Sequence, residues 1–293
     1  MFPHNKLQYL LLLIVVTLGL FVGLPLLHAK KTKFSPLDHV HQWICYYGSE
    51  ISAAFLKKTQ LIIADPDIIF PEIFPSEALP LFVGYVSVGE AEKYRWYWPL
   101  IKDKPWVLEE NPNWSGNHWV DVRSEEWQEL ILDHMIPRLL NRGYQGVFLD
   151  TLDTGEYLEG KDPEKWKGSQ KALVKLVKNI RRRYPQMIII PNNGLSLLPS
   201  IERHVDGVVI EDLYTRYNFE TKTCDRTPPS VTEDKETILD YFMRRMNKPV
   251  FVIHYAQERD QALADDAIRR SREKGYRSYT TTVDLKSIGK LAP

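Results

Sequence analysis

The chain has 293 residues, 44% of them hydrophobic, and its 38 basic side chains equal its 38 acidic ones in number. Balanced charge argues against a nucleic-acid-binding surface and against a disordered polyelectrolyte tail. One barrel-sized domain of roughly 250 residues, preceded by a short N-terminal segment, accounts for this length, so no second domain is required.

The N-terminal segment has the pattern of an export signal. Residues 7–27 are almost continuously apolar, Ala29 offers a small residue for cleavage, and three lysines follow by Lys33. We therefore predict a signal peptide over residues 1–29 and an exported protein, secreted or periplasmic. Because the apolar run is longer than most signal cores and long enough to span a bilayer, retention as a membrane anchor is the alternative.

The two cysteines, Cys45 and Cys224, do not make a disulfide framework. Cys45 lies in an apolar run and Cys224 in a polar segment, which favours two separate thiols over the alternative of one long-range bridge. Neither has a partner at metal-ligand spacing, and there is neither a His/Glu pair at zinc spacing nor a Gly-rich phosphate loop. We expect no metal and no cofactor.

Apolar segments of strand length recur along the chain, and most intervals between them carry apolar residues at helical spacing. Alternation of strand and helix predicts a parallel sheet with right-handed crossovers, and eight repeats predict a closed (β/α)8 TIM barrel. A doubly wound open sheet is the alternative. The predicted strands are Trp43–Tyr47, Leu61–Ala64, Leu81–Val88, Gly146–Asp150, Met187–Pro191, Gly207–Glu211, Val250–Tyr255 and Tyr276–Thr281.

The predicted barrel domain covers residues 42–285. Residues 30–41 are expected to form a linker or a segment at the bottom of the barrel, and residues 286–293 a tail. Too few residues follow Leu285 for a full helix, so we expect the last helix to be missing or incomplete, with N-terminal residues as an alternative cover for that side of the barrel.

Several residues mark the expected helix ends. Ser124 before two glutamates predicts one helix start, and Asp162 before Pro163 predicts another. Gly143 and Gly275 each precede a predicted strand, where a glycine commonly ends a helix. These signals place the predicted helices between the strands.

One segment interrupts the alternation of strands and helices. Residues 91–123 contain five tryptophans and two tyrosines and show no sustained helical or strand period. So long a connection after a barrel strand is uncommon unless it is functional. It is either a wall that holds a chain-like ligand or a loop folded on itself by aromatic packing.

Polar or acidic residues end four strand-like apolar runs, which are Tyr85–Glu90, Val147–Asp150, Ile188–Asn192 and Val208–Glu211. In a parallel barrel the reactive groups lie where the strands open into the following loops. Hydrolysis of a glycosidic bond needs one carboxyl group to protonate the leaving oxygen and a second to attack the anomeric carbon or to activate water. Asp150 and Glu211 are the candidate pair.

Predicted strands four and six are next-but-one neighbours, so their ends lie about 10 Å apart at a strand spacing near 4.8 Å. Side chains that lean inward can close this gap to the roughly 5 Å of a retaining enzyme or to the wider inverting separation, and the sequence does not choose between them. The nearby acids Glu90, Asp153 and Asp212 are expected to hydrogen-bond the loop backbone or to orient the pair.

Four segments together carry a family resemblance: YVSVGEAE at 85–92, YRWYW at 94–98, GVFLDTLD at 146–153 and GVVIE at 207–211. In this order and spacing they resemble the endo-α-1,4-polygalactosaminidase family of glycoside hydrolases. The resemblance implies a (β/α)8 hydrolase that cleaves α-1,4-linked galactosamine polymers, with the acids at Asp150 and Glu211 as the catalytic pair. We assign Asp150 as the nucleophile and Glu211 as the acid/base.

A galactosamine polymer that lacks acetyl groups is cationic, so a cleft that binds it should be anionic. The predicted strand ends carry several acids that meet this requirement. His254, at the end of the seventh predicted strand, is expected to be a hydrogen-bonded wall residue. The expected substrate-binding residues are Tyr46, Tyr47, Tyr85, Glu90, Asp153, Asn192, Asp212, Tyr214 and Tyr255.

Two other classes of protein stay open. A non-catalytic carbohydrate-binding TIM barrel of the cell envelope would need the aromatic residues but not Asp150, and a cell-envelope interaction protein would need neither. The partner expected of a hydrolase is a polysaccharide such as an exopolysaccharide, with no nucleic acid and no membrane contact except through the N-terminal segment. The sequence does not indicate the oligomeric state.

Overall fold

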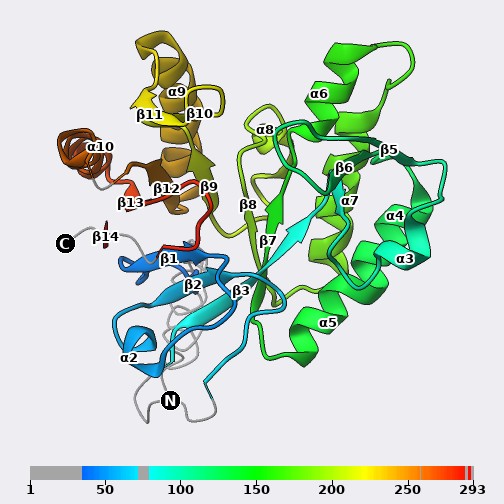
Figure 1. Cartoon of the computed structure of the whole chain (residues 1–293), viewed down its shortest axis with the longest axis horizontal. Coiled ribbons are helices and arrows are strands. Elements are labelled where there is room, and N and C mark those ends of the chain that lie inside the picture. Colours follow the sequence, from blue (N-terminus) through cyan, green and yellow to red (C-terminus); the bar gives the residue numbers. More distant parts are fainter. Residues whose placement is uncertain (1–34, 72–78, 258, 288–289, 292–293) are drawn as a thin grey trace, which may run out of the picture. The chain divides into compact units, whose positions relative to one another are not determined.

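The computed structural model of the chain describes residues 35–71, 79–257, 259–287 and 290–291 (Figure 1). The predicted signal peptide or anchor, residues 1–29, lies outside these ranges. Within them, no helix is both long and apolar enough to cross a membrane.

Eight parallel strands follow one another in chain order around the centre of the fold. Five of them form one hydrogen-bonded sheet and the other three a second. The strands are buried on both faces, which explains their nearly continuous apolar sequences. The first sheet contains β1 (Trp43–Tyr46), β2 (Leu61–Ala64), β3 (Leu81–Ser87), β7 (Gly146–Asp150) and β8 (Ile188–Pro191), and the second β9 (Val208–Glu211), β12 (Val250–Tyr255) and β13 (Arg277–Thr281).

The first seam between the two sheets joins β8 to β9 through the backbone. Asn192 and Val209 form a parallel bridge, and the Asp206 N–H donates to the Ile189 carbonyl over 2.8 Å. Neighbours in space are therefore neighbours in sequence, which excludes the doubly wound alternative, where the strand order reverses. Most observed strand limits are the predicted ones, and the others differ by a single residue.

The second seam, between β13 and β1, is held by side chains. The described residues show no strand pairing here. Instead the Tyr279 hydroxyl donates to the Cys45 carbonyl over 3.0 Å, and Trp43 Nε1 donates to the Arg277 carbonyl over 3.1 Å. With this contact the eight strands complete the predicted (β/α)8 arrangement.

The segment before β1 covers the N-terminal ends of the barrel strands. Leu37 and Val40 are fully buried. The Arg277 guanidinium, at the start of β13, donates to the carbonyls of Leu37 and Asp38, the latter over 2.9 Å. No helix follows β13 among the described residues, where β14 (Lys290–Leu291) instead pairs antiparallel with it. The expectation of a missing last helix is confirmed.

Helices lie in the connections between strands (Figure 1). α4 (Glu125–Leu130) begins at Ser124, whose side chain accepts the Trp127 N–H as predicted, and continues through a π-helical turn (Ile131–Met135) into α5 (Ile136–Asn141). Pro137 cannot continue the backbone ladder, which accounts for the wide turn before it. Further helices are α2 (Ala53–Leu56), α6 (Thr154–Lys161), α7 (Ser169–Arg183), α8 (Leu198–Ile201), α9 (Pro229–Met246) and α10 (Gln261–Lys274).

One predicted helix start is wrong. Asp162 follows the end of α6, and its side chain accepts the Lys165 N–H within a turn. α7 begins only at Ser169, because Gly168 at φ 92° breaks the helical path first. Gly143 and Gly275 do end helices, with φ of 90° and 76°.

Residues 91–123 are more regular than their sequence indicates. β4 (Glu90–Glu92), β6 (Asn117–Val120) and β5 (Val107–Glu110) form an antiparallel sheet, with α3 (Trp98–Ile101) inserted between β4 and β5. Strands of three or four residues are too short for an alternating pattern to stand out. A hairpin of β10 (Thr215–Asn218) and β11 (Thr223–Arg226) follows β9. Figure 1 shows these two additions on opposite sides of β7, β8 and β9.

Candidate active site

Three side chains meet at the C-terminal ends of β7, β8 and β9. Asn192 Nδ2 donates to Asp150 Oδ1 over 2.8 Å and to Glu211 Oε1 over 2.7 Å. The two bonded oxygens, Asp150 Oδ1 and Glu211 Oε1, therefore cannot be farther apart than the sum of these bonds, about 5.5 Å, a limit that the roughly 5 Å separation of a retaining enzyme satisfies. Asp150 and Glu211 both remain partly exposed. The structure thus brings the two predicted carboxyl groups together, with the amide of the intervening strand between them.

The residue directly after each of Asp150, Asn192 and Glu211 has a left-handed backbone. Thr151, Asn193 and Asp212 have φ of 60°, 50° and 53°, values that are uncommon outside glycine and unfavourable for a β-branched residue such as threonine. Their side chains support this geometry: Thr151 donates to the Asp150 carbonyl over 2.7 Å, and Asn193 Oδ1 accepts the Glu211 N–H over 3.2 Å. The chain turns sharply here, which leaves the carboxyl groups at the rim.

Buried tyrosines donate to the two carboxylates. Tyr85 hydrogen-bonds Asp150, and Tyr255 hydrogen-bonds Glu211. Tyr47 packs edge-on against Tyr85 with ring centroids 5.1 Å apart. Burial and the nearby carboxylates raise the pKa of all three hydroxyl groups, so they stay protonated and act as donors.

Burial and mutual repulsion change the acidity of the pair. Burial, the Asp150 charge and the Asp212 charge together raise the pKa of Glu211 to about 8, against a smaller lowering effect of the Asn192 hydrogen bond. Burial also raises the pKa of Asp150, whereas its hydrogen bonds with Asn192 and Tyr85 lower it. Glu211 is therefore the member of the pair that holds a proton near neutral pH.

Two further carboxyl groups and one lysine surround the pair. Burial raises the pKa values of Asp153, at the start of α6, and of Asp212. Lys235 on α9 donates to the carbonyls of Glu211 and Asp212 over 3.0 and 3.2 Å, and its charge lowers the pKa of Asp153 and Asp212. The Asp212 Oδ1 atom is buried without a hydrogen-bond partner. Acidic groups outnumber basic ones around the pair.

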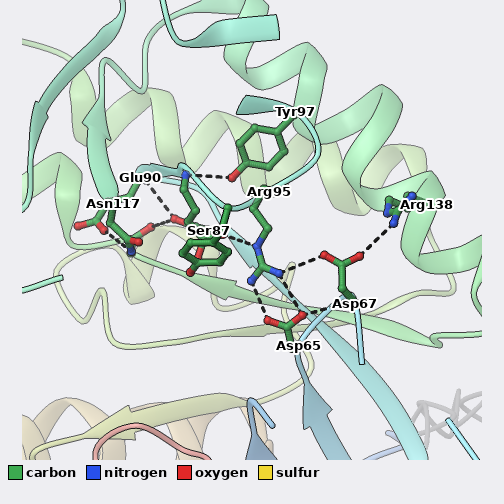
Figure 2. Close-up of polar contacts among 11 residues, drawn as sticks. Asp65, Asp67, Ser87, Glu90, Arg95, Tyr97, Asn117 and Arg138 are labelled. Carbon is green, nitrogen blue, oxygen red and sulfur yellow. Dashed lines mark hydrogen bonds and ion pairs between the residues drawn. The ribbon is translucent and has the colours of Figure 1, made fainter. Parts of the chain in front are cut away.

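Glu90 joins the small antiparallel sheet to this site. It accepts hydrogen bonds from Asn111 Nδ2 over 2.8 Å and Asn117 Nδ2 over 3.1 Å, and Figure 2 shows the Asn117 contact. Burial raises its pKa, with smaller contributions from the charges of Asp150 and Asp153. The two carboxylate oxygens of Glu90 thus hold the β5–β6 segment next to the pair.

An ion cluster supports the same rim from the side of β2. The Arg95 guanidinium forms ion pairs with Glu92 over 2.8 Å, Asp65 over 2.9 Å and Asp67 over 3.3 Å (Figure 2). Its side chain is 7% exposed and Glu92 is 3% exposed, so both charges are buried and paired. The guanidinium also lies 5.6 Å from the Tyr85 ring centroid, which connects the cluster to a residue that contacts Asp150.

Two of the predicted binding residues have their contacts elsewhere. Tyr214 donates to Glu236, and the Arg270 guanidinium lies 4.1 Å from its ring centroid, because the turn at Asp212 directs the following residues toward α9 and α10. The Tyr46 ring lies over Gly48, on the opposite face of β1 from Cys45. Only the other seven predicted binding residues have described contacts or charges linked to the pair.

His254 is fully buried in β12, and its Nε2 pairs with the Ser271 hydroxyl over 2.8 Å. Burial lowers its pKa to about 3, so it stays neutral, in keeping with a wall residue. Both cysteines are free: Cys45 is buried in β1 and Cys224 is half-buried in β11, so the alternative of a disulfide is wrong. Among the described residues, no group of three or more His, Cys, Asp or Glu side chains is placed to hold a metal ion.

Sequence reasoning missed Lys235, Thr151 and Asn193, and it assigned Arg95 no role at the site. Lys235 lies on α9, about two dozen residues beyond Glu211 in the chain, and no local pattern distinguishes it from an exposed helical lysine. Thr151 and Asn193 directly follow Asp150 and Asn192, which the sequence does single out, so their positions could have been predicted, although not their backbone conformation. Arg95 lies inside the YRWYW segment that carries the family resemblance.

The chain matches the model of glycoside-hydrolase family GH114 over residues 81–292. An uncharacterized protein of Thermotoga maritima is 26% identical over 222 residues, which are 70% of this chain and 66% of that protein. This chain therefore spans about two thirds of the length of that relative.

Two solved structures are similar in fold. The glycoside hydrolase domain of PelA from Pseudomonas aeruginosa has a TM-score of 0.71 at 20% identity, with 86% of this chain and 98% of that domain covered. Ega3 of Aspergillus fumigatus, in complex with galactosamine, has a TM-score of 0.66 at 15% identity, with coverage of 86% and 95%. These similarities support the TIM-barrel fold, and the family match covers most of the barrel. The chain therefore belongs to glycoside-hydrolase family GH114, the family of endo-α-1,4-polygalactosaminidases that its strand-end segments resemble.

Proposed function

We propose that the protein is an exported glycoside hydrolase that cleaves α-1,4-linked galactosamine polymers with Asp150 and Glu211. The observation that carries the proposal is the pair itself: two carboxyl groups, bridged by the Asn192 amide, at the catalytic end of a barrel. Membership of GH114 supports the reaction class. The separation of at most about 5.5 Å favours retention of anomeric configuration over inversion.

The proposed reaction has two displacement steps. The Asp150 carboxylate attacks the anomeric carbon while the Glu211 carboxyl gives its proton to the leaving oxygen, and a covalent glycosyl ester forms on Asp150. Glu211, now ionised, takes a proton from water, which attacks the anomeric carbon and releases Asp150. The raised pKa of Glu211, about 8, suits the group that must hold the proton at the start of the cycle.

The acidity of the site supports a cationic substrate. Glu90, Asp153 and Asp212 surround the pair, and Lys235 is the basic residue that contacts the strand end. An ammonium group on a sugar would be attracted to this field, and a low-dielectric rim strengthens the attraction. The structure of Ega3 in complex with galactosamine is consistent with such a ligand in a similar fold.

Export remains part of the proposal and is supported by the apolar run at residues 7–27. Fractionation of cells that produce the full chain tests it: a signal peptide predicts shortened protein outside the cytoplasm, and a retained anchor predicts full-length protein in the membrane fraction. Full-length protein in the soluble cytoplasm would exclude both.

The activity is tested by the release of reducing ends from partly deacetylated galactosaminan. Asp150→Asn and Glu211→Gln should each lower the initial rate by roughly 10²- to 10⁴-fold, the usual contribution of such groups. Asp153→Asn serves as a matched acid outside the pair and should lower it less. Equal release by the parent and by the double variant Asp150→Asn, Glu211→Gln would exclude the proposal, and binding without turnover would favour a carbohydrate-binding barrel instead.

A further inference from the structure

Two exposed aromatic side chains from separate loops touch each other near the candidate active site. Trp114, between β5 and β6, is 44% exposed, and Phe219, between β10 and β11, is 41% exposed. Their ring centroids lie 5.4 Å apart in a T-shaped arrangement. Tyr217 extends the row behind Phe219, with ring centroids 5.1 Å apart. These loops are separated by about a hundred residues of sequence, so the contact is tertiary.

The two loops rise on opposite sides of β7, β8 and β9 (Figure 1), and β7 and β9 end in the carboxyl pair. The base of the first is fixed to Glu90 through Asn111 and Asn117, on the β3 side of Asp150. The second leaves β9 four residues after Glu211. A contact between their tips therefore spans the ends of β7, β8 and β9, where Asp150 and Glu211 lie.

Each tip is a compact turn, ordered by an asparagine. In the first, Asn111 Oδ1 accepts the Asn113 N–H over 3.0 Å, and the Asn111 N–H donates to the Asn117 carbonyl over 2.7 Å. In the second, Asn218 Oδ1 accepts the N–H groups of Glu220 and Thr221 over 2.9 and 3.1 Å. The turns hold their own shape, so the Trp114–Phe219 contact can open without unfolding either loop.

We infer that Trp114 and Phe219 form a bridge over the carboxyl pair that opens to admit an internal stretch of the polysaccharide and closes over it. This inference rests on the proposed function. A T-shaped aromatic pair favours contact by a factor of roughly two to ten, so the bridge is closed most of the time but opens readily. Once a polysaccharide lies beneath the closed bridge, its dissociation from the enzyme is slowed by the same factor. The enzyme can then cleave the same polysaccharide molecule several times before releasing it.

The test measures where the cuts fall on insoluble, partly deacetylated galactosaminan. The parent should release several soluble fragments for each new reducing end that stays on the insoluble polymer. Trp114→Ala and Phe219→Ala, made in the full chain, should lower this ratio two- to tenfold. The double variant should show no further loss, because removal of either ring already breaks the single contact between them.

Tyr241→Ala is the matched control, because Tyr241 is 49% exposed on α9 and packs with Arg245 instead. Its ratio should equal that of the parent. An unchanged ratio in both single variants, multiplied effects in the double variant, or an equal fall in the control would overturn the bridge while the hydrolase stands. Absence of hydrolysis by the parent would overturn the proposed function and the bridge together.

Discussion

At the scale of single residues, the site depends on one nitrogen atom. Asn192 Nδ2 donates to both carboxyl groups, so the amide lowers the pKa of each while it fixes their separation. The other amide atom, Asn192 Oδ1, is buried without a hydrogen-bond partner. Loss of this side chain removes a hydrogen-bond donor from both carboxyl groups at once, so Asn192 affects their acidity as well as their separation.

The activity should therefore have an alkaline limit set by Glu211. Its pKa is raised to about 8, so the proton needed for the leaving group is present below that pH and is lost above it. We expect kcat/KM to fall about tenfold per pH unit above the limit. In Asn192→Ala the limit should move to higher pH, because the hydrogen bond that favours the charged form is gone, and the maximal rate should fall roughly 10- to 100-fold.

Profiles of kcat/KM between pH 4 and 10 on one substrate test this expectation. Titration of the substrate amines is common to the parent and Asn192→Ala, so the displacement between the two profiles reports the protein groups. An alkaline limit that moves downward in Asn192→Ala would contradict the assignment of Glu211 as the acid.

Arg95 gives a second prediction at this scale, for stability. Arg95→Met leaves Glu92 buried without its ion pair, which should lower the free energy of unfolding by about 3–5 kcal/mol. Arg138→Met is the control, since Arg138 is 44% exposed and pairs only with Asp67 in this cluster, and should cost less than about 1 kcal/mol. Urea unfolding of both variants measures the difference in the free energy of unfolding. Equal unfolding midpoints would show that burial of the ion cluster does not contribute to stability.

At the scale of elements, the tight approach between the β3–β4 connection and the start of α6 positions the rim. A Cβ atom at Gly89 would lie 2.3 Å from Thr154 Oγ1 and 2.4 Å from the Thr151 carbonyl oxygen. The Gly89 N–H also donates to Thr151 Oγ1 over 2.8 Å. Only a residue without a side chain allows the loop after β7 to lie this close to β3, and Asp150 immediately precedes that loop.

Gly89→Ala should consequently reduce both stability and activity. The overlap with backbone atoms should cost about 1–3 kcal/mol, or roughly 2–10 °C in Tm, and should displace Asp150. Gly160→Ala in α6 is the control, because its added Cβ would meet nothing within 4 Å beyond its chain neighbours and the backbone of its own helix, and it should be neutral or stabilising by up to about 1 kcal/mol. Calorimetry measures the Tm of the two variants, and reducing-end assays measure their activity. Equal Tm values and equal activities would contradict the steric explanation.

The sequence predicts the barrel strands and the carboxyl pair because both depend on local patterns. Apolar runs such as Gly146–Asp150 end in an acid, and parallel strands bring their ends to one rim. The short strands β4, β5 and β6 could not be predicted, because their pairing depends on partners eight to 29 residues away in sequence. Tyr214 was misplaced for a related reason: a sharp backbone turn at Asp212 redirects it.

At the scale of the whole molecule, closure of the barrel depends on groups outside the strand ladders. The seam between β13 and β1 is held by the Tyr279 and Trp43 side chains, and Leu37 packs at the bottom near Gly207. The missing last helix therefore leaves this part of the barrel to a segment that precedes the first strand. At this seam side-chain hydrogen bonds close the barrel, whereas backbone hydrogen bonds join the strands elsewhere.

Leu37→Ala should open a cavity beneath the barrel. Leu37 is fully buried, so the change should cost about 2–5 kcal/mol. His39→Ala, two residues away and exposed, should change the free energy of unfolding by less than about 0.5 kcal/mol. Denaturant titration of both variants measures this, and a small effect of Leu37→Ala would mean that residues 35–40 are dispensable for closure.

The three left-handed residues at the rim set a limit on how this enzyme could be made more heat-resistant. Each such position lowers the free energy of unfolding by on the order of 1–3 kcal/mol. Relaxation of the loops at Thr151, Asn193 and Asp212 would therefore stabilise the fold and raise its Tm. The same relaxation would move Asp150 and Glu211 away from Asn192 and break the two hydrogen bonds that join them. If variants are selected for thermostability with activity retained, we therefore expect the stabilising substitutions at the N-terminal ends of the barrel strands and none at these three positions.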